Sequence, residues 1–435
     1  MRFLASQVAA ATGGRLVGPD VELRGASFDS RSLQPGELFV PIVSERDGHD
    51  FLSAAVAVGA GAALSSRAAD AMIGMPIIEV ADTGQALLDL ATWARERLRA
   101  SVVGITGSVG KTSTKDLALA AVGAGRRAAA NVRSFNNEQG LPVTVLGAPD
   151  DVDVLLLEMG MRGPGEITRL CAVAQPEIGV VTAVAAAHTA LLGGIDAVAR
   201  AKAELVDALP STGVAVLNAD DARVTAMAER TAARVLRFGR HTEADVRIGD
   251  LTTDELARPS FTVVTPWGEC AVRLAVSGAH MAWNAAAALA VAGVVGVDVA
   301  AAAAALERAA LSARRMQVLT TVDGGLLIND AYNANPASMA AALEALAAID
   351  AERRVAVVGL MAELADPVAE HRAIARLAEQ LGVELVAVET AHYGTVPIGR
   401  GDVRATVVPI VSGTAVLVKG SLVAGLGPVA DELAG

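Results

Sequence analysis

The distribution of apolar and polar residues divides the chain into three parts. From about residue 99 to 310, short β-branched runs alternate with helical spacing, which predicts an α/β fold with a mostly parallel sheet and helices on both faces. Residues 1–98 contain short strands punctuated by glycine and proline, and 311–435 again alternate strand and helix. We therefore predict three domains, at 1–98, 99–310 and 311–435.

Two stretches refine this pattern. Between 244 and 276, short alternating strands broken by prolines predict a small antiparallel insert that covers one side of the sheet. The alanine-rich stretch 281–306 contains Asn284 and Asp298, so it predicts two packed helices and not a membrane span.

One strand-to-helix junction carries the clearest chemistry. An apolar run ends at Thr106, and small residues lead to Lys111 and Thr112, where a helical pattern begins. Glycines permit the φ values that turn successive N–H groups toward a polyanion, and the helix N-terminus adds its positive end. The junction predicts a phosphate-binding loop in which Lys111 reaches the β- and γ-phosphates and Thr112 offers a hydroxyl to Mg²⁺. Ile105 stands where the common pattern has its first glycine, so the loop is a tight variant; a glycine-rich turn with an incidental lysine is the alternative.

Three more polar residues are candidates for the same site. Glu158 ends the buried run 153–158, and doubly wound sheets bind ligands beyond the carboxyl ends of their strands, so we expect Glu158 near Mg²⁺ and Thr112. His188 follows an expected strand, and Lys202 lies in a helical stretch. Taken singly, the last two fit an ordinary loop histidine and a solvated lysine better than a site.

Composition limits the function classes. The chain has 36 basic and 48 acidic residues, and its net charge of −12 argues against general binding of nucleic acid or anionic membranes. Cys171 and Cys270 lie far apart without metal-ligand spacing, so we expect core residues in a reducing compartment. The N-terminal apolar run is interrupted by polar residues, which favours an ordinary helix over a secretory signal. We expect a cytoplasmic protein without stable membrane insertion.

The motifs, taken in order, resemble those of the Mur ligases over nearly the whole chain. They are Thr-Gly-Ser-Val-Gly-Lys-Thr at 106–112, Ser-Phe-Asn-Asn-Glu at 134–138, Glu-Met-Gly at 158–160, Ala-His at 187–188, Ala-Lys-Ala-Glu-Leu at 201–205, Leu-Asn-Ala-Asp at 217–220, Asp-Ala-Tyr-Asn-Ala-Asn-Pro at 330–336 and Lys-Gly-Ser at 419–421. Family members that add a diamino acid are expected to carry Asp-Asn-Pro-Arg in the last domain, and this chain does not. The Tyr-Asn-Ala-Asn-Pro loop instead favours the members that add D-alanyl-D-alanine.

The resemblance implies a three-domain, ATP-dependent amide ligase. An N-terminal domain would bind the UDP substrate, a central P-loop domain would bind ATP, and a Rossmann-like C-terminal domain would complete the nucleotide site. ATP would phosphorylate the terminal carboxylate of UDP-N-acetylmuramoyl-tripeptide, and the amine of D-alanyl-D-alanine would attack the acyl phosphate. ATP and two Mg²⁺ ions are the implied cofactors, and a monomer is expected.

The resemblance also implies roles for individual residues. Thr112 and Glu158 would hold one Mg²⁺, and His188 and a carbamylated Lys202 would serve the second; Lys111, Lys202 and His188 would be catalytic. The residues implied to bind ATP are Thr106, Gly107, Ser108, Val109, Gly110, Lys111, Thr112, Ser113, Asn284, Arg315, Asp330, Tyr332 and Asn333. Those implied to bind the UDP substrate are Ser30, Arg31, Asn136 and Asn137.

The chain also departs from the family pattern. The family often has Asn and Gly within the stretch 182–185, an Asp at the position of Leu360 and an Arg at the position of Leu422. Only about twenty residues separate Tyr393 from Ala415, so we expect a shortened C-terminal domain. Two alternatives therefore stay open: another amino-acid ligase of the superfamily, such as a different Mur ligase or a folylpolyglutamate synthase, and a non-catalytic nucleotide-binding regulator.

Overall fold

The computed structural model describes residues 1–67, 74–132, 135–186 and 189–435 of the chain. Its backbone clusters into two compact units. The first comprises Met1–Gly104, Arg127–Met161 and Gly165–Ile178, and the second Ile105–Arg126, Arg162–Pro164 and Gly179–Gly435. Across the described ranges, no helix has both the length and the apolar character needed to cross a membrane. The three predicted domain boundaries stay a prediction.

The first unit contains two small sheets and the helices packed on them. Strands β1 and β3 pair antiparallel, and a five-stranded sheet has the order β2-β7-β6-β5-β4. A core cluster that includes Phe39, Leu52 and Ile77 holds the five-stranded sheet to helix α2. The elements are β1 (Arg2–Leu4), α1 (Ala5–Thr12), β2 (Arg15–Val17), β3 (Glu22–Arg24), β4 (Ala26–Ser27), β5 (Leu38–Phe39), α2 (Leu52–Val58), β6 (Ala62–Ser65), β7 (Ile77–Glu79), α3 (Thr83–Arg97), β9 (Ala128–Ala130), α5 (Gly140–Gly147), β10 (Val154–Glu158) and α6 (Glu166–Ala174).

A nine-stranded sheet has the order β16-β15-β14-β13-β12-β11-β8-β10-β9. Strands β12, β13 and β14 pair parallel, whereas β14, β15 and β16 pair antiparallel. The predicted antiparallel strands are therefore present, but they extend the edge of the sheet and do not cover one side, which is a correction. Because β14 pairs directly with β13, its backbone is satisfied within the same sheet. The remaining bounds are β8 (Ser101–Thr106), β11 (Ile178–Val181), β12 (Val214–Asn218), β13 (Arg234–Gly239), β14 (Val246–Thr253), β15 (Pro259–Thr265) and β16 (Gly268–Arg273).

Alanine-rich helices pack closely within the second unit. Helix α10 (Met281–Val294) is buried along almost its whole length and lies against α4 (Lys111–Gly123), and α11 (Val299–Leu306) packs beside both. Small side chains allow this close approach, so the alanine bias reflects packing, and the predicted helix pair is confirmed. The other helices here are α7 (Thr189–Leu192), α8 (Ile195–Asp207) and α9 (Ala222–Thr225).

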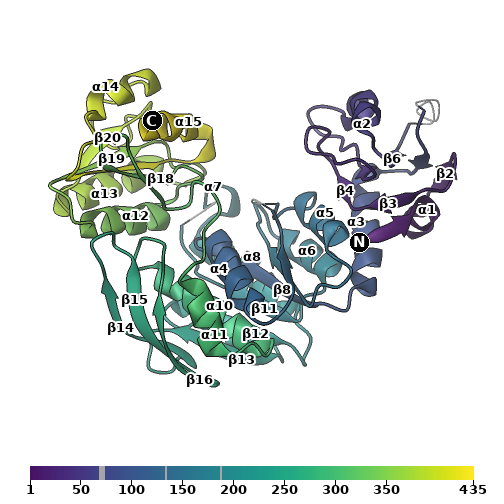
Figure 1. Cartoon of the computed structure of the whole chain (residues 1–435), viewed down its shortest axis with the longest axis horizontal. Coiled ribbons are helices and arrows are strands. Elements are labelled where there is room, and N and C mark those ends of the chain that lie inside the picture. Colours follow the sequence, from purple (N-terminus) through teal and green to yellow (C-terminus); the bar gives the residue numbers. More distant parts are fainter. Residues whose placement is uncertain (68–73, 133–134, 187–188) are drawn as a thin grey trace. The chain divides into compact units, whose positions relative to one another are not determined.

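The C-terminal part of the second unit is a five-stranded sheet in the order β17-β18-β21-β19-β20. All its pairs are parallel except the edge pair β17 and β18. Helices α12 and α13 cover one face, and α14 and α15 lie on the other side (Figure 1). The bounds are β17 (Gln317–Thr320), β18 (Leu326–Asp330), α12 (Pro336–Ala348), β19 (Arg353–Val358), α13 (Pro367–Gln380), β20 (Glu384–Ala387), α14 (Val403–Val407), β21 (Thr414–Lys419) and α15 (Gly427–Ala434).

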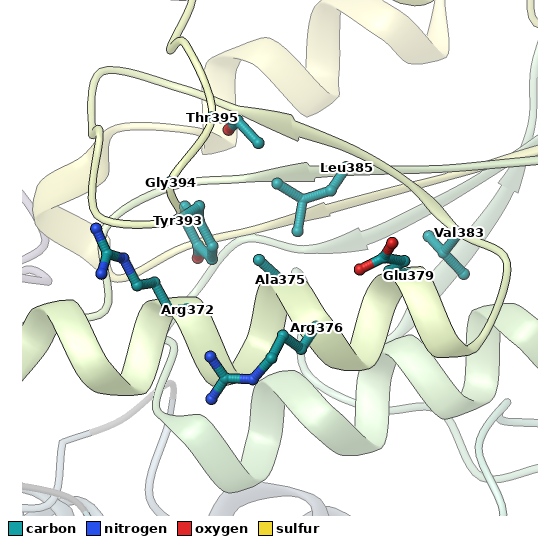
Figure 2. Close-up of a pocket in the computed structure, with 9 residues that line it drawn as sticks. All are labelled: Arg372, Ala375, Arg376, Glu379, Val383, Leu385, Tyr393, Gly394 and Thr395. Atoms are coloured by element: carbon teal, nitrogen blue, oxygen red, sulfur yellow. The ribbon is translucent and has the colours of Figure 1, made fainter.

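The segment expected to be shortened lies between β20 and β21. It contains the short helix α14 and a single 3₁₀ turn at Arg400–Asp402. A cavity of about 570 Å³ opens between this segment, α13 and β20, with Tyr393, Leu385 and Arg372 in its wall (Figure 2). None of the predicted site residues that the structure describes lines this cavity, so their chemistry lies elsewhere.

The α/β architecture predicted from the pattern is confirmed, but several elements were missed. The missed elements include strands β9, β13 and β17 and helices α3, α5, α6, α14 and α15. All of these are short except α3, which spans 15 residues. Cys171 is buried as expected, whereas Cys270 on β16 is only half-buried, which corrects the expectation of two core cysteines. Strand β16 is at the edge of its sheet, which leaves Cys270 partly accessible.

Candidate active site

The predicted phosphate loop joins the end of β8 at Thr106 to the start of α4 at Lys111. Gly107 has φ of +150° and Gly110 φ of +81°, conformations that L side chains rarely adopt. A Cβ at Gly107 would collide with the Thr182 hydroxyl, and one at Gly110 would lie 2.5 Å from the Asn284 Oδ1. Both positions therefore require glycine.

The first residues of α4 carry the polar groups of the loop. The Lys111 Nζ donates to the Gly107 carbonyl at 2.7 Å, so this side chain folds back over the loop. Thr112 is buried, and its Oγ1 accepts a hydrogen bond from the Arg315 Nη2 at 2.9 Å. Ser108 and Ser113 are also nearly buried. The predicted lysine and threonine thus stand at a helix N-terminus, where a phosphate is favoured electrostatically.

Two residues that the sequence reasoning did not assign support this loop. The Thr182 hydroxyl donates to the Val109 carbonyl at 2.6 Å, and the Thr182 N–H donates to the Thr106 carbonyl at 3.0 Å. The Asn218 Nδ2 in turn donates to the Thr182 carbonyl at 2.8 Å. Both residues lie at the carboxyl ends of strands, β11 and β12. That position was the signal for Thr182, and Asn218 also belongs to the Leu-Asn-Ala-Asp motif at 217–220.

Asn284 lies in the first turn of α10, against the phosphate loop. Its Oδ1 accepts from the Thr114 hydroxyl at 3.3 Å, and its side chain covers Gly110. The structure therefore places Asn284 beside the loop that the resemblance associates with it.

The start of the C-terminal part also reaches this loop. The Arg315 guanidinium lies over the Tyr332 ring, 4.1 Å from its centroid, while it contacts Thr112. The Asn335 Nδ2 donates to the Ser108 carbonyl at 3.4 Å, and its Oδ1 caps α12 by accepting from the Ser338 N–H at 2.9 Å. Arg315 and Tyr332 were expected here. Asn335 was not assigned, although it belongs to the Tyr-Asn-Ala-Asn-Pro motif.

Asp330 and Asn333 flank Tyr332 on the same loop. Asp330 ends β18 and is buried, and its Oδ1 accepts from the Met316 N–H at 3.0 Å. The Asn333 Oδ1 accepts from the N–H of the next residue, Ala334, at 2.9 Å. Asp330 is thereby tied to the linker that carries Arg315.

Lys202 lies on α8 and is buried, although helix lysines are usually solvated. Burial, together with the Lys111 cation, lowers the pKa of Lys202 well below its ordinary value. This lowering shifts the equilibrium toward the neutral amine, which is the form that reacts with CO₂ to give a carbamate. His188, the other predicted ligand of the second Mg²⁺, falls outside the described residues.

Glu158 belongs to the first unit, at the end of β10, and is almost fully buried. Its Oε1 accepts from the Asn136 Nδ2 at 2.7 Å, and its N–H donates to the Asn131 Oδ1 at 2.9 Å. Asn136 therefore orients the predicted metal-binding carboxylate. Asn131 was missed, because a lone asparagine after an alanine run gives no sequence signal.

The predicted UDP residues also lie in the first unit. The Arg31 side chain is exposed, and its Nε and Nη2 donate to the Asp29 carboxylate at 2.8 and 2.7 Å. Ser30, next to it, is half-buried. The Asn137 Oδ1 accepts from the Gly140 N–H at 2.9 Å at the start of α5. The structure shows these residues in turns, and their contact with a nucleotide stays a prediction.

Comparison with known proteins identifies the family. A family model described as the Mur ligase middle domain matches residues 105–292, and one described as the Mur ligase, glutamate ligase domain, matches 314–397. The UDP-N-acetylmuramoyl-tripeptide–D-alanyl-D-alanine ligase of Mycobacterium bovis is 43% identical, over 93% of this chain and 91% of its own length. The chain belongs to the Mur ligase family. The Escherichia coli ligase of the same name is 36% identical to this Mur ligase, over 88% of the chain and 84% of the relative.

Solved structures of Mur ligases also resemble this chain over its whole length. MurF from Acinetobacter baumannii has a TM-score of 0.89 at 28% identity, covering 100% of this chain and 99% of its own. MurF ligase from Thermotoga maritima, solved in complex with ADP, has a TM-score of 0.81 at 25% identity and covers 94% and 96%. This Mur ligase therefore shares the α/β architecture of MurF.

Proposed function

We propose that this chain is the ATP-dependent ligase that adds D-alanyl-D-alanine to UDP-N-acetylmuramoyl-tripeptide, forming the pentapeptide precursor of peptidoglycan. The observation that carries the proposal is its 43% identity, over nearly full length, to a ligase of that name. A phosphate loop with Lys111 at its helix N-terminus supports an ATP-consuming step.

The reaction begins with transfer of the ATP γ-phosphoryl group to the substrate carboxylate, which gives an acyl phosphate and ADP. The amine of D-alanyl-D-alanine then attacks the acyl carbon, and the tetrahedral intermediate loses phosphate to leave an amide. Carboxylate and phosphate repel each other, so the site must supply positive charge where they meet. Lys111 and the Arg315 guanidinium, which contacts Thr112, are suited to this role.

The candidate site offers side-chain oxygens, which are the ligands that Mg²⁺ prefers. Glu158 offers a buried carboxylate and Thr112 a buried hydroxyl, and each would be a Mg²⁺ ligand. Carbamylation would turn the buried Lys202 into an oxygen ligand for a second ion, together with His188. When bound, the ions would neutralise charge that develops on the transferred phosphoryl group.

Residues of the C-terminal part would complete the nucleotide site. Arg315 and Tyr332 stack beside the phosphate loop, and Asn284 lines it from α10. We infer that they contact ATP together with Asp330 and Asn333. A single nucleotide would then be held both by the phosphate loop and by these residues of the C-terminal part. Nucleotide binding would close the C-terminal part over the loop and keep water from the acyl phosphate.

The UDP substrate would be bound by the first unit. We infer that Ser30 and Arg31 contact the uridine diphosphate, because an exposed guanidinium on a turn suits diphosphate recognition. Asn136 and Asn137 would lie along the muramoyl-peptide. We also propose a cytoplasmic monomer, which sedimentation should report near 44.1 kDa.

An ADP-release assay tests the function. UDP-N-acetylmuramoyl-tripeptide and D-alanyl-D-alanine are added separately and together, with ATP and Mg²⁺. We expect stoichiometric ADP, phosphate and pentapeptide only when both are present. Release with folate or a single amino acid instead would indicate another ligase of the superfamily, and no release under any condition would indicate a non-catalytic nucleotide-binding protein.

A further inference from the structure

Lys419 is a buried lysine at the end of β21, outside every role assigned above. It lies directly opposite Asp330, because β18 and β21 are parallel and pair these two residues in register. The side chains are 3% and 11% exposed, and the Lys419 Nζ lies 2.5 Å from the Asp330 Oδ2. A buried ammonium is costly unless it is paired and hydrogen-bonded, and the Asp330 carboxylate supplies such a partner.

The same ammonium makes a second bond. The Lys419 Nζ donates to the Asn333 carbonyl at 3.0 Å, three residues beyond Asp330. One side chain therefore ties together both ends of the turn that carries Tyr332. Since strands of the sheet end here in parallel, the turn is on the edge where such folds bind ligands.

The other oxygen of Asp330 extends the connection to the linker. The Asp330 Oδ1 accepts from the Met316 N–H, next to Arg315. Arg314 and Met316 on either side of Arg315 have φ of +61° and +46°, a region that non-glycine residues rarely adopt. Such a backbone is retained only when its surroundings fix it, and the bond to Asp330 is one such constraint. Arg315 in turn contacts both Tyr332 and Thr112.

We propose that Lys419 is a positioning residue for the nucleotide, acting through Asp330. Its ammonium holds the Asp330 carboxylate, which fixes the Met316 backbone and with it the guanidinium of Arg315 beside the phosphate loop. The proposal rests on the proposed function for the identity of the nucleotide. It gives the Lys-Gly-Ser motif a physical role in the site.

Four variants test this assignment: Lys419→Met, Asp330→Asn, the double variant Lys419→Met/Asp330→Asn, and the control Arg353→Met. The Arg353 Nη2 lies 3.0 Å from the Glu384 Oε2 in the same sheet. This pair is exposed and lies where its strands begin, whereas Lys419 and Asp330 lie where their strands end. For each variant we measure the KM for ATP, the KM for UDP-N-acetylmuramoyl-tripeptide and the Kd for ADP.

Lys419→Met is expected to raise the KM for ATP and the Kd for ADP at least tenfold, with the KM for the UDP substrate within twofold. The control should leave all three within twofold. The double variant buries no charge from this pair. If Lys419 acts through Asp330, the Kd of the double variant for ADP should lie within threefold of the Kd of Asp330→Asn alone. That comparison does not require Lys419→Met to fold.

Two results would overturn the proposal. Equal changes in both KM values would show a general loss of structure, and a further tenfold loss in the double variant would show that Lys419 contacts the nucleotide itself. ADP binding is measured without the other substrates, so it tests Lys419 even if the wild-type chain fails to make the pentapeptide.

Discussion

At the scale of single residues, two lysines carry most of the proposed chemistry for opposite physical reasons. Lys111 stands at a helix N-terminus that already favours anions, and it adds a full charge to that partial one. Lys202 is buried on α8, and burial lowers the pKa of its amine well below the ordinary value. Lys111 would act as a cation, whereas Lys202 would act through the oxygens of its carbamate.

Lys111→Ala removes the cation of the phosphate loop. We expect kcat to fall by about 10²–10³ or more, because preorganised charge at a transferring phosphoryl group is worth that much. The ADP-release assay with both substrates measures it. An unchanged melting temperature would show that the loop still folds, and turnover above about a tenth of wild type would contradict the role of Lys111.

Lys202→Ala tests the carbamate. We expect loss of turnover that a short carboxylic acid, such as acetate, partly restores, because its oxygens replace those of the carbamate. The matched control is Arg200→Ala, an exposed position on the same helix, which should leave turnover unchanged. Wild-type turnover in Lys202→Ala without added acid would exclude the carbamate.

At the scale of elements, strand ends and helix starts determine where polar groups meet. The phosphate loop is held by α4 below and by the ends of β11 and β12 beside it, through Thr182 and Asn218. Its conformation also depends on glycine, since Thr182 occupies the space that a side chain at Gly107 would need.

Gly107→Ala should therefore distort the loop. Strain at such a φ costs about 1–3 kcal/mol, and the clash with Thr182 adds to it, so we expect a lower melting temperature and loss of ADP binding by calorimetry. Gly123→Ala, at the far end of the helix α4 that follows the loop, is the control. A Cβ at Gly123 meets nothing within 4 Å, so that variant should be stabilised by about 0.4–1 kcal/mol. Normal ADP affinity in Gly107→Ala would contradict the requirement for glycine.

At the scale of the whole molecule, residues far apart in the chain meet at one loop. Asn335 and Ser108 are 227 residues apart and share a hydrogen bond, and Arg315 and Thr112 are 203 apart. These contacts link the C-terminal part of the second unit to the phosphate loop.

Asn335→Asp separates this contact from helix capping. Aspartate still caps α12 by accepting from the Ser338 N–H, but it cannot donate to the Ser108 carbonyl, and its charge faces that oxygen. We expect kcat/KM for ATP to fall about tenfold, roughly 1.4 kcal/mol, with little change in melting temperature. Asn335→Ala should lose both the cap of α12 and the bond to Ser108. Its free energy of unfolding should fall by about 1 kcal/mol, and its melting temperature should fall with it. An unchanged kcat/KM in Asn335→Asp would show that the contact is unimportant.

The α/β class, the phosphate loop and the helix pair at 281–306 could be predicted from the sequence, because periodicity, glycine φ values and helix starts are local properties of the chain. The sequence also placed Glu158 at a strand end. Three contacts became visible only in the folded chain: Thr182 supports the loop, Asn335 reaches Ser108 and Lys419 faces Asp330. Each depends on strand order and register across the fold, and no spacing along the chain encodes which distant strand ends become neighbours.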